Sequence, residues 1–96
     1  MLEIKPTCEN CNKPLPNDSA EAMICSFECT FCADCVNHVL ENVCPNCGGG
    51  FVQRPTRPKV KLERNPVGTR VVYKPVDLTE FALLKEQYKN IAPDKR

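Results

Sequence analysis

Eight cysteines, all in the first half of the chain, are the residues whose types and spacing could do chemistry. They form three Cys-x-x-Cys pairs and one Cys-x-x-x-Cys pair. Zinc prefers thiolate sulfur, takes four ligands in structural sites, and binds readily to cysteines that lie two to four residues apart. Four such pairs can hold two zinc ions with no ligand left over. The eight residues are Cys8, Cys11, Cys25, Cys29, Cys32, Cys35, Cys44 and Cys47.

Disulfides and an iron–sulfur cluster are the alternatives for a short cysteine-rich chain. The segment from Met1 to Pro6 has neither a basic start followed by an apolar run nor a small-residue cleavage site. We therefore expect a cytoplasmic protein, whose thiols stay reduced, and we favour zinc. No apolar stretch approaches the length of a membrane span, so a membrane is not an expected partner.

The residues alone leave two arrangements of the ligands open. In a sequential arrangement each ion takes two consecutive cysteine pairs, and in an interleaved arrangement each ion takes alternate pairs. In both arrangements four thiolates coordinate each ion and leave no position for water, so metal catalysis is not expected. His38 is expected to face solvent or support a ligand, and no group of residues suggests nucleophilic catalysis. We expect a protein that is not an enzyme.

The ligand order, C-x2-C-x13-C-x3-C-x2-C-x2-C-x8-C-x2-C, is similar to the RING-finger pattern, with a cysteine in place of the usual histidine at the fourth ligand. The resemblance covers residues 8 to 47 and implies a RING-like or treble-clef module with an interleaved cross-brace. One zinc ion would then be held by Cys8, Cys11, Cys32 and Cys35, and the other by Cys25, Cys29, Cys44 and Cys47.

RING ubiquitin ligases usually carry a large aliphatic residue before the second ligand, an aromatic residue four positions after the sixth, and a basic residue soon after the eighth. Here those positions hold Asn10, Val39 and Gly48, and the chain has no tryptophan. Only Pro45 fits. Ubiquitin ligation is therefore an alternative function that the residues disfavour.

The chain also resembles a bacterial group of short cysteine-rich proteins, the domain of unknown function 1272 family. The likeness lies in the runs Ile24-Cys-Ser-Phe-Glu-Cys-Thr-Phe-Cys-Ala-Asp-Cys35 and Asn42-Val-Cys-Pro-Asn-Cys-Gly-Gly-Gly50, and it extends over about residues 1 to 58. This resemblance implies zinc binding and a bacterial cytoplasm. It implies no activity, because the activity of the family is itself unknown.

Short elements are expected to position the cysteines. Residues 21–29 are compatible with a short strand or hairpin. Four apolar residues then recur at i, i+3, i+4 and i+7 from Val36 onward, which predicts one face of a short helix with Cys35 in its first turn. The first fifty residues contain few bulky apolar side chains, so metal binding and folding should be one event.

A hairpin and a helix are expected after the metal module. The two prolines of residues 53–59 predict an extended linker. Apolar residues alternate with polar ones on both sides of the turn-like Asn65–Gly68, which predicts a β-hairpin over residues 60–74. Asp77 is a good N-cap for a helix from Leu78 to Lys89. The expected fold is a small metal-bound α+β chain divided into residues 1–52, 53–59 and 60–96.

The charge is unevenly distributed. The formal charge of +1 combines a net −5 in residues 1–50 with a net +6 in residues 51–96. Arg54 to Lys74 contains seven basic residues and one acidic residue, so nucleic-acid binding through this segment is an alternative. Our main hypothesis is a structural zinc-binding protein that acts as a protein–protein interaction or regulatory module. Its partner would be an unknown protein, or a second copy bound through the C-terminal segment.

Overall fold

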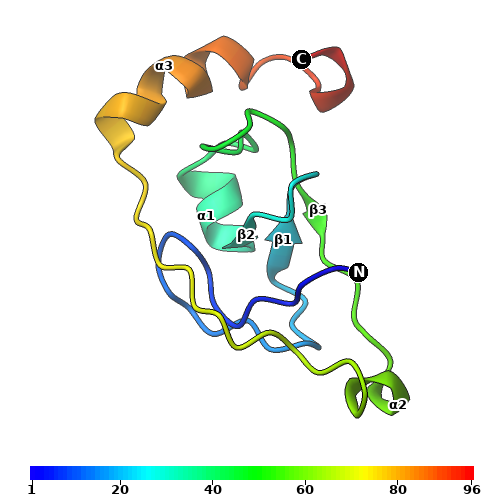
Figure 1. Ribbon diagram of the computed structural model, residues 1–96. Coiled ribbons are helices and arrows are strands. Elements are labelled where there is room, and N and C mark those ends of the chain that lie inside the picture. The colour runs from blue at the N-terminus through cyan, green and yellow to red at the C-terminus, as the bar shows by residue number, and fades with distance from the viewer.

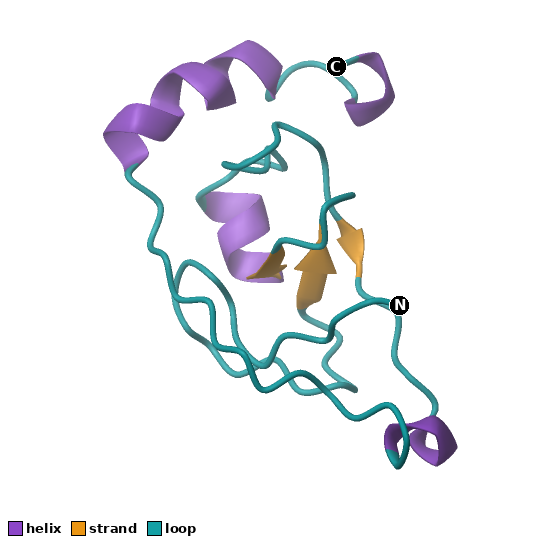
Figure 2. Ribbon diagram, viewed as in Figure 1, coloured by secondary structure: helices purple, strands orange, loops and turns teal.

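The computed structural model describes residues 1–96, and loops connect its short helices and strands (Figures 1 and 2). The expected α+β class is confirmed. The elements are β1 (Ala22–Ile24), β2 (Thr30–Cys32), α1 (Ala33–His38), β3 (Val52–Gln53), α2 (Lys59–Leu62), α3 (Leu78–Tyr88) and the 3₁₀ helix η1 (Pro93–Lys95).

The three strands form one antiparallel sheet in the order β2-β1-β3. Met23 lies opposite Phe31 of β2 on one side and Gln53 of β3 on the other. Every residue of β2 is buried, and the ring of Phe31 meets that of Phe51 edge to face, with the ring centroids 5.5 Å apart. The prediction of a strand within residues 21–29 is confirmed, and its partner begins directly after Cys29.

Helix α1 is shorter than its apolar pattern suggests. The predicted inner face is confirmed, because Val36, Leu40 and Val43 are all buried. The regular helix ends at His38, and Glu41 and Asn42 then adopt positive φ values of 49° and 60°. The last two inward residues therefore lie on a tight turn after the helix rather than within it.

The predicted β-hairpin over residues 60–74 is wrong. Lys59–Leu62 is a single helical turn, and the later extended segment pairs with the N-terminal part of the chain instead. Gly68 donates its N–H to the carbonyl oxygen of Ile4, and Lys74 donates to that of Glu9, each at 2.8 Å. The alternating pattern correctly indicated an extended backbone after Gly68, but its hydrogen-bond partner lies far away in the sequence.

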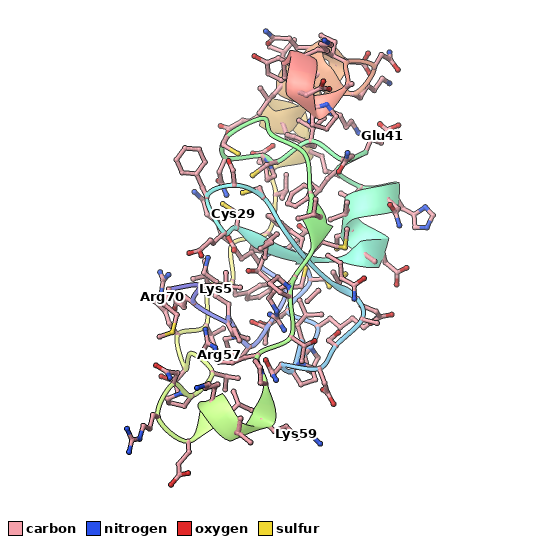
Figure 3. The ribbon with its side chains drawn as sticks, turned by 90° about the vertical axis from the view of Figure 1, so that its right-hand side faces the viewer. Lys5, Cys29, Glu41, Arg57, Lys59 and Arg70 are labelled. Carbon is pink, nitrogen blue, oxygen red and sulfur yellow. The ribbon has the colours of Figure 1, made fainter.

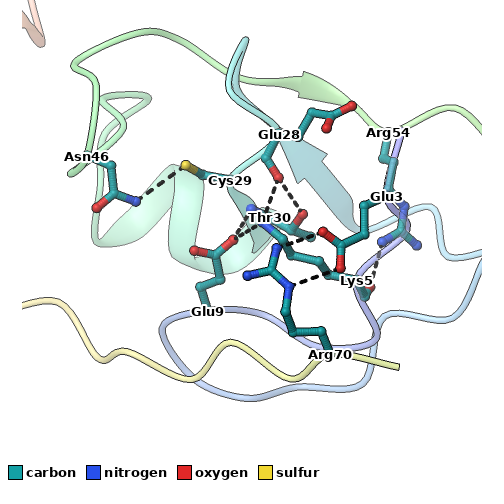
Figure 4. Close-up of polar contacts among 9 residues, drawn as sticks. All are labelled: Glu3, Lys5, Glu9, Glu28, Cys29, Thr30, Asn46, Arg54 and Arg70. Atoms are coloured by element: carbon teal, nitrogen blue, oxygen red, sulfur yellow. Dashed lines mark hydrogen bonds and ion pairs between the residues drawn. The ribbon is translucent and has the colours of Figure 1, made fainter. Parts of the chain in front are cut away.

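Two arginines hold residues 53–59, the predicted linker, against the module. Arg54 is only 1% exposed, and its guanidinium donates to the carbonyl oxygens of Lys5, Leu15 and Pro16 at 2.7–3.0 Å. Figure 4 shows the bond to Lys5. Arg57 donates in the same way to three carbonyl oxygens, those of Leu2, Asn65 and Pro66. These bonds tie the N-terminal segment to the loop before and after α2.

The predicted C-terminal helix is confirmed and ends one residue earlier than expected. The side chain of Asp77 accepts hydrogen bonds from the N–H groups of Thr79 and Glu80, which makes it the N-cap of α3. Phe81 is 5% exposed and belongs to the same apolar core as the cysteines. In Figure 1, α3 and η1 lie across the end of the module that carries the loop after α1.

Candidate metal centres

Four cysteines from two distant turns meet in a first cysteine group. All their sulfurs lie within 4.8 Å of one another. The Sγ atoms of Cys8 and Cys35 are 3.8 Å apart, and those of Cys11 and Cys32 are 3.7 Å apart. A tetrahedral site with zinc–sulfur bonds of about 2.3 Å requires sulfurs about 3.8 Å apart, so this group fits zinc. The first cysteine group comprises Cys8, Cys11, Cys32 and Cys35.

A second cysteine group contains Cys25, Cys44 and Cys47, whose sulfurs also lie within 4.8 Å of one another. Cys29, the fourth residue predicted for this site, is half-buried and its sulfur lies outside that set. Its carbonyl oxygen accepts a hydrogen bond from the N–H of Cys25 at 3.2 Å, so both residues belong to one turn. A sequential arrangement would place Cys25 and Cys29 beside the first pair, but Cys32 and Cys35 lie there.

The end of β2 and the start of α1 position two cysteines of the first group. Cys32 is the N-cap of α1, and its sulfur accepts the N–H of Cys35 at 3.5 Å. Cys35 is in the first turn of α1, as expected, and points into the core. His38, at the last position of α1, is exposed and belongs to neither cysteine group.

Two of the Cys-x-x-Cys turns share both their sequence pattern and their backbone conformation. Cys8–Cys11 reads Cys-Glu-Asn-Cys, and Cys44–Cys47 reads Cys-Pro-Asn-Cys. In each turn the first cysteine accepts, at its carbonyl oxygen, the N–H of the residue after the second cysteine, Asn12 at 3.0 Å or Gly48 at 2.8 Å. Asn12 and Gly48 have φ values of +63° and +78°, a region that asparagine and glycine tolerate best. Each cysteine group therefore contains one such Cys-x-Asn-Cys turn.

The asparagine of each Cys-x-Asn-Cys turn donates to a sulfur on the opposite turn. Asn10 Nδ2 lies 3.3 Å from the sulfur of Cys35. Asn46 Nδ2 lies 3.4 Å from the sulfur of Cys29 (Figure 4). An N–H donor stabilises the thiolate form of cysteine, which is the form that binds metal. Sequence reasoning assigned neither asparagine this role, although the repeated Cys-x-Asn-Cys was a signal that could have found it.

The amide of Asn10 can be tested by substitution. Asn10→Asp keeps an oxygen that can accept the N–H of Val76, which lies 2.9 Å from Asn10 Oδ1, but it replaces the donor to Cys35 with a negative charge. We expect the zinc affinity of the first site to fall about 10- to 100-fold, measured by competition with a chelator. Asn37→Asp places the same charge on an exposed position of α1 and should change little. Equal affinities in the two variants would contradict the role given to Asn10.

The protein environment sets the protonation of the thiols. Burial raises the pKa of Cys35 and Cys44 far above the ordinary value, and raises that of Cys29 and Cys32 in the same direction. The amides of Asn10 and Asn46 act in the opposite sense on the pKa of Cys35 and Cys29. Without metal, these four groups are therefore neutral thiols at pH 7, and metal binding would displace their protons.

The affinity for the metal is accordingly expected to fall steeply as the pH is lowered. Because zinc binds the thiolate, its apparent affinity falls as the pH falls, by up to about 10⁴-fold per pH unit for a site of four thiols. Chelator competition between about pH 8 and pH 6 measures this slope. An affinity that does not change with pH would contradict ligation by the buried cysteines.

No helix of the chain combines the length and the apolar character that crossing a membrane requires. The longest, α3, has 11 residues.

Comparison with known proteins places the chain in a family. Residues 1–57 match the family model described as "Protein of unknown function (DUF1272)". An uncharacterized protein of Rhizobium meliloti (strain 1021) is 53% identical over 75 residues, which are 78% of this chain and 89% of that relative. At least 18 of these residues (75 − 57) lie beyond the family model. No solved structure matches. The resemblance carried by the cysteine-rich runs is thus confirmed, and the chain belongs to the DUF1272 family.

Proposed function

We propose that the protein is a non-enzymatic structural zinc protein that binds two zinc ions and acts through contact with another protein. The observation that carries the proposal is the first cysteine group, whose sulfur–sulfur separations of 3.7 and 3.8 Å suit a tetrahedral zinc ion. Bound zinc would supply folding free energy to a segment with few apolar residues. The chain's own residues hold the turns on which the thiols are placed.

Cys29 is the fourth ligand of the second site in this proposal. Its support is the repeated relation between the two turns. Asn10 donates to Cys35, the second cysteine of its pair, and Asn46 donates to Cys29, also the second cysteine of its pair. Cys29 is thus related to the second group as Cys35 is to the first, because each accepts a hydrogen bond from the asparagine of that group's Cys-x-Asn-Cys turn. The pairing is then interleaved, as in a RING-like or treble-clef cross-brace.

The ligand set argues against catalysis by the metal. Four thiolates around each ion leave no position for water or substrate, so the metal would have no Lewis-acid role. Ubiquitin ligation is further disfavoured because the C-terminal part of the chain contacts the three positions that would bind a conjugating enzyme. Asn10 accepts the N–H of Val76, the carbonyl oxygen of Val39 is 3.5 Å from Lys85 Nζ, and Gly48 lies under Tyr88.

Native mass spectrometry of the purified protein tests the metal content. The proposal predicts two zinc ions per chain, both of which leave when acid protonates the thiols. A metal-free chain with four disulfides would contradict it. A reducing cytoplasm is the location that this chemistry suits, because thiolates bind zinc only while they remain reduced.

The basic segment suggested nucleic-acid binding as an alternative function. The hydrogen bonds of its arginines within the chain argue against this alternative. Arg54 and Arg57 donate to backbone carbonyl oxygens, and Arg70 forms two hydrogen bonds to Glu3 at 2.7 and 3.1 Å. In Figure 3, Lys59 lies at the tip of α2, whereas Arg57 lies against the body of the molecule. Titration of labelled DNA and RNA at two salt concentrations discriminates, because phosphate binding must weaken steeply with salt.

A further inference from the structure

Residues 74–96, here called the C-terminal arm, contact the Cys-x-Asn-Cys turns of both cysteine groups. At the first turn, the N–H of Lys74 donates to the carbonyl oxygen of Glu9, and the N–H of Val76 donates to Asn10 Oδ1 at 2.9 Å. The same Asn10 donates to the sulfur of Cys35. One side chain therefore joins the start of the arm to a metal-binding sulfur.

The arm packs more closely on the second turn. A Cβ atom added to Gly48 would lie 3.0 Å from a ring carbon of Tyr88 and 3.7 Å from Leu84 Cδ1. A Cβ atom added to Gly50 would lie 2.5 Å from the ring of Pro93. The absence of a side chain at Gly48 and Gly50 thus leaves room for the arm to pack against this loop.

The end of the arm is also bonded to this loop. Arg96 Nη1 donates to the carbonyl oxygens of Asn42 and Gly48, at 2.8 and 3.0 Å. Lys85 forms an ion pair of 3.5 Å with Glu41 just after α1 (Figure 3 shows Glu41 below the C-terminal helices). The arm therefore spans the loop that carries Cys44 and Cys47, from its start near Glu41 to Gly50.

We propose that the C-terminal arm is a latch that slows the loss of zinc from the second site. Cys47 is exposed and is the ligand of this site that solvent reaches most easily. For the metal to leave, Cys47 must dissociate and its loop must open, and Tyr88, Pro93 and Arg96 must first lose their contacts with that loop. Docking of the arm and retention of the metal are then coupled, and each must favour the other. This inference rests on the proposed zinc sites and adds a segment that controls the rate of metal release.

The test uses the full zinc-loaded chain and an excess of a chromophoric chelator. Tyr88→Ala and Arg96→Ala should each release one zinc ion about tenfold faster than the unsubstituted protein, while the other ion leaves at an unchanged rate. Arg96 lies outside the apolar core, so its replacement leaves the core intact. The matched controls are Gln87→Ala and Lys95→Ala, which alter exposed neighbours and should leave both rates unchanged.

Hydrogen exchange of residues 78–96 in the same samples shows whether each variant has freed the arm. Faster exchange of the arm together with faster loss of one ion supports the latch. Faster exchange with zinc leaving at the original rate overturns it. If the unsubstituted protein binds no zinc, the proposed function itself fails, so the two failures are distinguishable.

Discussion

Replacing Cys44 with serine is expected to lower the zinc content from two ions to one and to unfold the loop between α1 and β3. Cys44 is fully buried and lies within 4.8 Å of the sulfurs of Cys25 and Cys47. A structural zinc site contributes about 10–16 kcal/mol, far more than this short loop can replace with other contacts. Native mass spectrometry reports the ion count, and cysteine Cβ chemical shifts report which sites have changed.

The same variant tests the pairing of the ligands. In the interleaved arrangement the Cβ shifts of Cys25 and Cys29 should change most, because these residues share an ion with Cys44. Changes centred on Cys32 and Cys35 would instead support the sequential arrangement. Ser26→Ala alters an exposed residue between two ligands and should retain both ions.

Replacing Arg54 with alanine is expected to lower the free energy of unfolding by about 3–5 kcal/mol. The guanidinium is almost fully buried and donates to the carbonyl oxygens of Lys5 and Leu15, which would otherwise lie without a partner. It also donates to the carbonyl oxygen of Pro16, which accepts the N–H of Ser19 as well. Burial lowers the pKa of Arg54, yet the group stays charged, so these three bonds are charge-assisted.

Thermal unfolding at a fixed excess of zinc measures this effect, and the midpoint should fall by more than about 10 °C. Arg54→Lys should recover only part of the loss, because one ammonium group cannot reproduce the fork that reaches separate carbonyls. Arg64→Ala, on the exposed segment after α2, should change the unfolding free energy by less than about 0.5 kcal/mol. A loss below about 1 kcal/mol for Arg54→Ala would contradict the role assigned to Arg54.

Local signals predicted the parts of the structure that depend on neighbouring residues. The spacing of the cysteines indicated metal-binding turns, because two ligands on one turn are neighbours in sequence. Asp77 indicated the start of a capped helix for the same reason. The inner face of α1 was also local, although its helix ends early at two residues with positive φ.

The rest depends on contacts between distant residues. Alternation after Gly68 indicated an extended backbone, but nothing in it identified Glu9 and Asn10 as the partners of Lys74 and Val76. Composition likewise could not separate a buried arginine such as Arg54 from an exposed basic residue. The sulfur that each asparagine contacts could not be predicted either, because that sulfur lies on a turn that is distant in the sequence.

Zinc K-edge X-ray absorption of the purified protein tests the central claim most directly. Two all-cysteine sites predict a single shell of about four sulfurs at about 2.3 Å per zinc ion, with two ions per chain. A shell containing nitrogen or oxygen would contradict four-cysteine ligation, and three sulfurs with one light atom at half of the zinc would show that one of the eight cysteines is not a ligand. Absence of zinc from the reduced protein would contradict the claim entirely.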